Sequence, residues 1–354
     1  MYNAGIIGCG RWGPNLLRNF YSSHQTKVLW VCDSDPVRLA GIQEQYPHLT
    51  AGADAAELLD RHPVDVLIVA TPVSTHSDLV MLGLQHGCHV FVEKPLAATS
   101  ADCLSLIEES FKRGRLLFVD YTYLFHPDIH LIKNYIAEGR LGERLLYYTS
   151  MRVNWGPVRR DVSAIGDLAV HDLAILSYIC PQRPKAITAQ GIAHVSGEPI
   201  NQAFLSCFYP DDFQARIAVN WYAPRKIRRI MIGGSRRTIE YDELNPMHQI
   251  QVYSTPLPEN STSLHDVDTS RPETNLWIPE RSRQEPLRLA VEAFYACLDD
   301  PDKALFNHNV SLEIASILEA SSKSLEQQGR QISLEETRAA QQEQMARILA
   351  SARP

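Results

Sequence analysis

The first 33 residues constrain the fold of this chain more than any other stretch. They open with a short apolar run over residues 4–7, continue through a glycine-rich turn over 8–13 (GCGRWG) into a segment of helical spacing, and return with a second apolar run over 28–32. The acid Asp33 follows that run, twenty residues after the last glycine of the turn. Strand, glycine turn, helix, strand and acid in this order are typical of a βαβ unit that binds a dinucleotide.

The turn predicts a separate task for each of its glycines. Gly8 allows the tight turn, Gly10 allows the close approach of a pyrophosphate, and Gly13 allows the helix to pack closely on the strand. The phosphates would lie on free backbone N–H groups at the helix N-terminus. Arg11 and Trp12 complete the turn, so we expect them to contact the cofactor as well. A glycine triplet alone is common in turns, but the strands, the helix and the acid around it make this interpretation specific.

The acid at position 33 also bears on which dinucleotide binds. A carboxylate at the end of the second strand accepts hydrogen bonds from a ribose diol and repels a 2′-phosphate. Arg38 lies close enough along the chain to soften that repulsion, but one arginine does not cancel the carboxylate. We therefore expect NAD as the cofactor, with NADP less favoured, and include Asp33 and Arg38 among the residues that hold it.

Length and composition bound the remaining possibilities. The 354 residues are enough for two domains with separate cores, and an apolar fraction of 45% is typical of a globular protein. The formal charge of −7 argues against nucleic acid as a partner. No apolar run reaches the length of a membrane span, and the first residues lack a signal-peptide pattern. The seven cysteines form no C-x-x-C pair, so we expect reduced cysteines in a cytoplasmic protein.

Strand-like and helical segments alternate over the first 122 residues. Apolar runs over 64–70, 89–92 and 116–119 follow the two already described, and helical patterns separate them over 36–46, 53–60, 77–86 and 100–112. This alternation predicts an α/β Rossmann domain, a doubly wound parallel sheet with helices on both faces, over residues 1–122.

The pattern changes after residue 122. Expected helices cover 127–138 and 166–179, and strand-like runs begin at residue 144 and recur over 186–195, 203–208, 213–221, 228–232 and 238–241, with a hairpin signal at 233–235 (GGS). Residues 254–283 are polar and predict a long loop, and helices over 287–298 and 310–325 would close the domain. We predict an α+β domain with a mostly antiparallel open sheet over 123–330, and a peripheral helix or frayed tail over 331–354.

Such an open sheet predicts an oligomer. One face would pack on the helices of its own domain, which leaves the other face to be covered. The alternating apolar positions Met151, Val153, Ile217 and Val219 cannot all be assigned to one core from the sequence. We expect a homodimer or a homotetramer formed through this sheet.

Polar residues follow two strands of the first domain, where ligands of open α/β sheets bind. Thr71 and Pro72 end one strand, with His76 shortly after them, and Glu93 and Lys94 end the next. We expect these five residues to contact the cofactor. Because Lys94 follows an apolar run and precedes a proline, its ammonium should stay near the ligand crevice. The alternative is a strand-end lysine in a surface ion pair, and the neighbouring cofactor turn favours a catalytic lysine.

The second domain contributes an acid and a histidine on one expected helix. Asp167 and His171 are separated by four residues, so both side chains point the same way on a helix. A carboxylate beside a histidine fixes its orientation and stabilises its protonated form, which suits an acid–base residue near neutral pH. The alternatives are a surface Asp–His pair and half of a metal site. No third ligand is suggested by the spacing, so we expect no metal.

These motifs together resemble the family of glucose–fructose oxidoreductase, inositol dehydrogenase and rhizopine catabolism proteins, known as Gfo/Idh/MocA. The resemblance covers residues 4–325 and is carried by the glycine turn, by 70–72 (ATP), by 93–95 (EKP) and by Asp167-x-x-x-His171. It implies that Lys94 and His171 flank the substrate carbon opposite the nicotinamide and that Asp167 joins them. Many members have a Gly-Gly run before the aspartate, whereas this chain has 164–166 (AIG), so the shape of the substrate pocket is expected to differ.

A narrower resemblance concerns the substrate. Residues 10–16 (GRWGPNL), 124–127 (LFHP) and 152–161 (RVNWGPVRRD) are similar to members from polysaccharide and sugar-nucleotide pathways. Arginine forks could hold a diphosphate or a sugar carboxylate, or they could be solvated or paired with acids such as Asp161. The residues expected to bind substrate are Tyr123, Arg152, Asn154, Trp155, Arg159, Asp167 and His171.

The sequence thus predicts an NAD(P)-dependent oxidoreductase that transfers hydride between nicotinamide and a secondary alcohol or ketone of a sugar, with a nucleotide-linked sugar favoured. One alternative is a dehydrogenase of a free cyclic polyol such as an inositol. Another is a non-catalytic protein that senses the dinucleotide, although the presence of Lys94, Asp167 and His171 argues against it. The sequence does not define the sugar, the carbon that reacts or the physiological direction.

Overall fold

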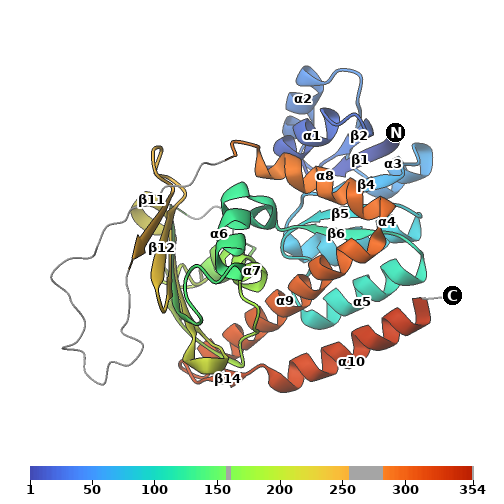
Figure 1. Cartoon of the computed structure of the whole chain (residues 1–354). Coiled ribbons are helices and arrows are strands. Elements are labelled where there is room, and N and C mark those ends of the chain that lie inside the picture. Colours follow the sequence, from blue (N-terminus) through green and yellow to red (C-terminus); the bar gives the residue numbers. More distant parts are fainter. Residues whose placement is uncertain (157–160, 255–281, 353–354) are drawn as a thin grey trace, which may run out of the picture. The chain divides into compact units, whose positions relative to one another are not determined.

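The computed structural model describes residues 1–156, 161–254 and 282–352. By its contacts the chain divides into two compact units (Figure 1). The first unit comprises Met1–Phe125, Gln284–Ser316 and Thr337–Pro354, and the second comprises His126–Arg283 and Ile317–Glu336. Both units are therefore built from segments that are separated in the sequence. Contiguous domains over 1–122 and 123–330 were expected, and these boundaries remain a prediction.

The first unit is built on a six-stranded parallel sheet with the order β3-β2-β1-β4-β5-β6. Its strands are β1 (Tyr2–Ile7), β2 (Thr26–Cys32), β3 (Thr50–Gly52), β4 (Val66–Val69), β5 (His89–Glu93) and β6 (Leu117–Asp120). The helices between them are α1 (Gly13–Tyr21), α2 (Pro36–Gln45), α3 (Ala55–Arg61), α4 (His76–Gln85) and α5 (Ser100–Lys112). This strand order is that of a Rossmann sheet, and it confirms the predicted fold class.

Later parts of the chain complete the core of the first unit. Helix α8 (Pro286–Asp299) places Phe294 against Phe20, Phe91 and Phe118, with ring centroids about 6 Å apart. The sequence pattern assigned this helix to the second domain. Its apolar face packs instead on the first sheet, because a helical stripe shows that a helix is buried but not against which sheet.

The edge strand β6 is protected by helix α9 (Leu305–Glu326). The Asn307 amide accepts from the backbone N–H of Val119 (2.9 Å) and donates to its carbonyl (2.8 Å), and His308 Nε2 lies 2.8 Å from the carbonyl oxygen of Leu117. These side chains occupy the backbone groups that a further strand would bind, which removes an exposed sheet edge.

The second unit contains an eight-stranded sheet with the order β13-β12-β11-β7-β10-β9-β8-β14. Its strands are β7 (Leu145–Trp155), β8 (Ala186–Ile192), β9 (Gln202–Phe208), β10 (Gln214–Asn220), β11 (Tyr222–Gly234), β12 (Arg237–Asp242), β13 (Ile250–Ser254) and β14 (Ile332–Ser333). All neighbours run antiparallel except β7 and β10, which confirms a mostly antiparallel sheet. Most of the predicted loop over 254–283 lies outside the described residues.

Three further helical segments belong to the later part of the chain. Helix α6 is Pro127–Ala137, and a π-helical turn (Ile165–Ala169) continues directly into α7 (Val170–Ile179). Helix α10 (Glu335–Ala352) covers most of the segment for which a peripheral helix or a frayed tail was expected. None of the helices in the described residues is long and apolar enough to cross a membrane.

The two faces of the second sheet differ. Ile217 and Val219 of β10 are buried and lie opposite Ser150 and Arg152, on the face that packs in the core of this unit. On the other face Met151 is 46% exposed and Phe204 on β9 is 54% exposed, whereas Val153, which alternation places on the same face of β7 as Met151, is buried. Met151 belongs to an open face that carries other exposed apolar side chains.

Candidate functional site

The glycine turn after β1 has the shape that the sequence predicted. A Cβ at Gly13 would lie 1.9 Å from the carbonyl oxygen of Gly8, and Gly8 itself has a φ of +98° with Ala70 O 2.5 Å from its Cβ position. A Cβ at Gly10 would meet only the Arg38 side chain, at 3.7 Å. The fold therefore requires Gly8 and Gly13, while Gly10 leaves the open space that a pyrophosphate needs for close approach.

Helix α1 begins at this turn without any acidic group. No side chain caps its N-terminus, no acidic residue lies in its first turn, and Pro14 occupies a first-turn position where a missing N–H is harmless. The helix dipole and the backbone N–H groups of the turn favour an anion there. These residues fit the pyrophosphate of a dinucleotide.

Asp33 is fixed at the carboxyl end of β2 by backbone donors. The Cys9 N–H donates to its Oδ2 (2.6 Å), and the Asp35 N–H donates to its Oδ1 (2.9 Å). Arg38 Nη1 lies 3.7 Å from Oδ2 and its Nε lies 3.3 Å from Asp35. The carboxylate is thus oriented before any ligand binds, and each oxygen has a second lone pair for a ribose hydroxyl. Burial, with the charge of Asp33, raises the pKa of the Cys9 thiol to about 12, so this cysteine is no nucleophile.

The loops after β4 and β5 are joined by one imidazole. His76 is fully buried, and its ring nitrogens lie 2.9 Å from the carbonyl oxygens of Pro95 and Thr71. We expected His76 among the cofactor-binding residues, but its ring has no surface left for a ligand. It supports this edge of the sheet from within. Thr71 and Pro72 remain at the surface of the edge.

Lys94 is buried at the end of β5, next to two acids. Glu93 and Asp120 are opposite each other in the β5–β6 ladder, and Asp120 accepts a hydrogen bond from the Thr122 hydroxyl (3.0 Å). Burial raises the pKa of Asp120 to about 6, against the lowering effects of hydrogen bonds with Thr122, Glu93 and Trp12 and of the Lys94 charge. We did not predict a role for Asp120 from the sequence, although it ends an apolar run as Glu93 does.

In the second unit, Asp167 is held by an indole. The residue is 7% exposed and lies in the π-helical turn, and the Nε1–H of the buried Trp221 donates to its Oδ2 (3.1 Å). His171 lies half-buried in the first turn of α7. Single π turns inside helices occur often at functional sites. The structure thus places both residues on one continuous helical segment, as predicted.

Arg152 has a different environment from the one expected. Its side chain is buried, its Nε donates to Asp172 Oδ2 (2.9 Å), and one of its terminal nitrogens lies 3.8 Å from Glu243. The Tyr148 hydroxyl donates to the same Asp172 carboxylate (3.1 Å). Burial, then the charge of Asp172, raises the pKa of Tyr148 well above its usual value. Arg152 was predicted to line a substrate pocket. In the structure it connects β7 to α7 through Asp172, the residue that follows His171.

The other predicted substrate residues have different local environments. Asn154 Oδ1 accepts from Arg228 Nη2 (2.5 Å), and Trp155 is 76% exposed at the end of β7, opposite Tyr222 on β11. Tyr123 is half-buried in the first unit. Arg159 lies outside the described residues. In the part of the chain that the structure describes, no group of three or more His, Cys, Asp or Glu side chains is arranged to hold a metal ion.

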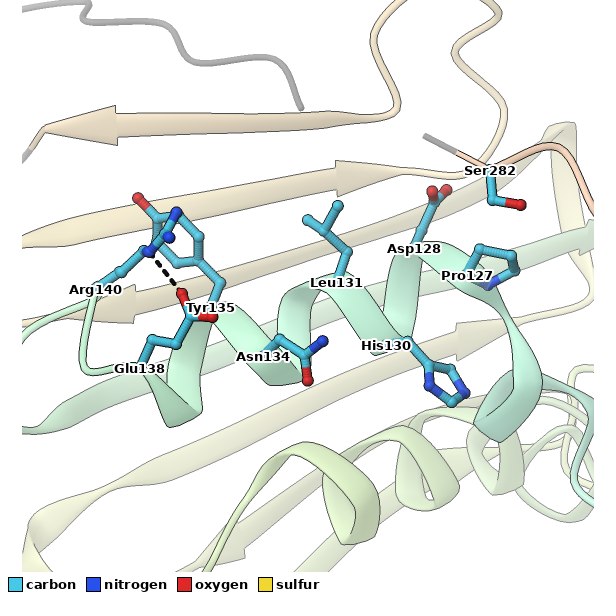
Figure 2. Close-up of a pocket in the computed structure, with 9 residues that line it drawn as sticks. All are labelled: Pro127, Asp128, His130, Leu131, Asn134, Tyr135, Glu138, Arg140 and Ser282. Atoms are coloured by element: carbon cyan, nitrogen blue, oxygen red, sulfur yellow. Dashed lines mark ion pairs between the residues drawn. The ribbon is translucent and has the colours of Figure 1, made fainter. Parts of the chain in front are cut away.

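A groove of about 430 Å³ runs along α6 (Figure 2). Figure 2 shows its lining side chains spread along the helix, with the Glu138–Arg140 ion pair (2.7 Å) near the carboxyl end. It is lined by Pro127, Asp128, His130, Leu131, Asn134, Tyr135, Glu138, Arg140 and Ser282. None of the residues predicted to bind cofactor or substrate belongs to this set, so we do not assign the site to this groove.

Comparison with known proteins defines the class. Residues 2–121 match a family model described as an oxidoreductase family with an NAD-binding Rossmann fold, and residues 129–240 match a model of the GFO/IDH/MocA C-terminal domain. The first unit therefore has an NAD-binding Rossmann fold of the oxidoreductase type. The two matches together cover well over half of the chain, which belongs to the Gfo/Idh/MocA family.

Individual relatives differ in the substrates they are named for. The chain is 30% identical to inositol 2-dehydrogenase 2 of Saccharopolyspora erythraea over 190 residues, which is 53% of this chain and 56% of the relative. It is 27% identical to myo-inositol 2-dehydrogenase of Thermotoga maritima over 198 residues, 55% of this chain and 59% of that protein. The matches thus span little more than half the length of these curated relatives.

One solved structure extends the likeness in fold to nearly the whole chain. The UDP-N-acetylglucosamine 3-dehydrogenase GnnA of Acidithiobacillus ferrooxidans superposes with a TM-score of 0.76, covering 92% of this chain and 98% of that one at 20% sequence identity. At this identity the likeness shows the shared fold alone.

Proposed function

We propose that this chain is an NAD-dependent oxidoreductase that interconverts a secondary alcohol and a ketone on a sugar, and that the sugar carries a nucleotide. The observation that carries the proposal is the carboxyl edge of the first sheet. There the oriented carboxylate of Asp33 and the open glycine turn follow two strands, and the buried Lys94 ends a third strand of the same sheet. Membership of an NAD-binding oxidoreductase family supports the reaction class.

The proposed chemistry divides the work among three side chains. The bound cofactor supplies the acceptor or donor of the hydride. His171 takes the hydroxyl proton when the alcohol is oxidised and returns it to the oxygen when the ketone is reduced. Lys94 polarises that oxygen with its ammonium and shares in the proton transfer. Asp167 orients the imidazole of His171 and accepts a hydrogen bond from a substrate hydroxyl.

Removal of either basic group should reduce turnover by roughly a hundredfold or more, the scale of a lost general acid or base. Lys94→Ala and His171→Ala are the test variants. Matched controls are Lys112→Ala, an exposed lysine of α5, and His86→Ala, which removes a surface histidine 3.3 Å from Asp60. NAD affinity should barely change in His171→Ala. Near-normal turnover of folded His171→Ala would exclude this residue and leave Lys94, or a tyrosine such as Tyr123, as the base.

The substrate class can be tested by a panel followed through the absorbance of reduced NAD. The panel contains nucleotide sugars, the same sugars without the nucleotide, and cyclic polyols. Turnover with nucleotide sugars and its loss when the nucleotide is removed would support the proposal. The relatives named inositol dehydrogenases favour a second candidate, a free cyclic polyol, and turnover of inositols alone would establish it. No cofactor reduction with any compound would favour a dinucleotide-sensing protein.

We also propose that the open face of the second sheet forms a homodimer or homotetramer. Met151 and Phe204 are about half exposed on neighbouring parts of this sheet, and apolar patches of this kind are usually covered by a partner. Light scattering at micromolar concentration should give a multiple of the chain mass. Replacement of both residues by aspartate should give the monomer, and a monomer mass for the unaltered protein would contradict the proposal.

A further inference from the structure

Trp221 connects the second sheet to the acid that the proposed function uses. It follows β10 directly, is 2% exposed, and lies 54 residues from Asp167 in the sequence. Its backbone is fixed from both sides, because its N–H donates to the carbonyl of Asn201 (2.9 Å) and its own carbonyl accepts from the N–H of Gly156 (2.6 Å). The buried indole extends from this fixed backbone and places its N–H on the Asp167 carboxylate.

The segment that carries Asp167 departs locally from α-helical geometry. Its π-helical turn changes the directions of the side chains relative to a regular α-helix, and the contact with Trp221 holds the Asp167 carboxylate from outside the helix. A neutral indole N–H donates one hydrogen bond to one carboxylate oxygen and cannot take up a proton. It therefore orients Asp167 without competing for a proton, which is what a carboxylate working beside an acid–base histidine requires.

We propose that Trp221 is a positioning residue for the reaction: its indole N–H fixes the Asp167 carboxylate in the orientation in which it acts on His171 and on the substrate. This inference rests on the proposed function. It adds a residue that contacts neither cofactor nor reacting atoms and acts only through Asp167.

The first experiment removes the N–H and little else. Trp221→Phe should lower kcat by roughly ten- to a hundredfold, the effect of a misplaced catalytic group, with KM and NAD affinity nearly unchanged. Trp30→Phe is a matched control, since its buried indole also donates one hydrogen bond, to the carbonyl of His62 (2.9 Å). The control should lose comparable stability and keep its kcat.

A double-mutant cycle separates positioning from a general loss of structure. If Trp221 acts through Asp167, Trp221→Phe should have little further effect on kcat in an Asp167→Ala background, whereas a purely structural role would give the same fold loss in both backgrounds. Equal losses in the two backgrounds, or a kcat loss no larger than that of Trp30→Phe, would overturn the inference.

A second variant covers the case in which Trp221→Phe does not fold. Site-specific incorporation of 3-benzothienyl-alanine at position 221 keeps the shape of the indole and replaces its N–H by sulfur. The same kcat loss is expected, and unchanged kcat would overturn the inference. Turnover by the unaltered protein tests the proposed function on its own, so active unaltered protein with insensitive Trp221 variants rejects only the positioning role. Absence of any turnover rejects the proposed function and the role of Trp221 with it.

Discussion

In the first unit, Asp33 is held by backbone N–H groups, whereas in the second unit Asp167 and Asp172 are held by side chains from the sheet, Trp221 and Arg152. Backbone donors are supplied by any residue, so the arrangement around Asp33 follows once the turn and the strand have formed. Side-chain donors must be present at particular distant positions. The second arrangement is therefore more sensitive to single substitutions and harder to find from a local pattern.

The largest effect on stability is expected at the buried ion pair. Arg152→Ala would leave the Asp172 carboxylate buried without its cation, and breaking such a pair lowers the free energy of unfolding by about 3–5 kcal/mol. Arg38→Ala, in the first unit, removes an arginine that is 53% exposed and should lower the free energy of unfolding by at most about 1 kcal/mol. Denaturant unfolding followed by circular dichroism measures both.

A double variant at the Arg152–Asp172 pair tests whether the unpaired charge causes this loss of stability. The double variant Arg152→Met with Asp172→Leu replaces both charges by apolar groups of similar size, which should recover much of the stability lost in Arg152→Ala. Equal, small losses in Arg152→Ala and Arg38→Ala would show that the second unit does not depend on this side-chain contact.

The next effect concerns the first unit and depends on pH. Burial lowers the pKa of His308 from 6.5 to about 4, partly offset by its hydrogen bond to Leu117. Above pH 6.5 the ring is neutral in both the folded and the unfolded chain. As the pH falls towards about 4, only the unfolded chain takes up the proton, so the folded state loses about 3 kcal/mol. His308→Gln should lack this loss.

The measurement for His308 is the difference between parent and variant in the free energy of unfolding, followed over this pH range. Other acids titrate in both proteins and cancel in the difference. The advantage of the parent should therefore shrink as the pH falls. A difference that stays constant with pH would mean that His308 accepts a proton in the folded protein.

Features that depend on local contacts could be predicted from the sequence, whereas those that depend on distant contacts could not. Helix α5 could be predicted from its helical pattern, and the ends of β1 and β2 from runs of apolar residues that stop at turns. The positions of Asp33 and Lys94 could be predicted because each residue stands at a strand end. Strand β3 has only three residues and gave no readable pattern. Each of these outcomes depends on the chain within a few residues.

Arg152 and Asp120 show what a local pattern lacks. Alternation along β7 correctly grouped Arg152 with Tyr148 on one face, but it does not show whether that face meets solvent or a helix that carries an acid. Asp120 acquires its environment from Glu93 on a neighbouring strand and from Trp12 in the first turn. Both environments are created by tertiary packing, which a single sequence does not reveal.

A smaller effect separates the glycines of the nucleotide turn. Gly10→Ala adds a methyl group where only Arg38 approaches, so the free protein should keep its melting temperature. The methyl group would occupy the space expected for the pyrophosphate, and NAD affinity should fall by roughly tenfold, about 1.4 kcal/mol. Gly13→Ala would instead collide with Gly8 and destabilise the fold itself. Calorimetric titration with NAD distinguishes them, and unchanged NAD affinity in Gly10→Ala would contradict the proposed site.

The smallest effect is expected at Asp33, and it tests whether a backbone-held acid selects the cofactor. Asp33→Ala removes two hydrogen bonds to the ribose diol of NAD, so NAD should bind a few-fold more weakly, on the order of 1 kcal/mol. The same change removes the repulsion of the 2′-phosphate of NADP, so NADP should bind no worse. Arg38 would then lose its contact with Asp33 and keep the one with Asp35, which leaves its Nη1 group available to the phosphate. The gap between the two cofactors should narrow, and the double variant Asp33→Ala with Arg38→Ala should lose any gain for NADP. If NADP binds the unaltered protein more tightly than NAD, the orientation of Asp33 by the Cys9 and Asp35 N–H groups serves the turn and not the choice of cofactor.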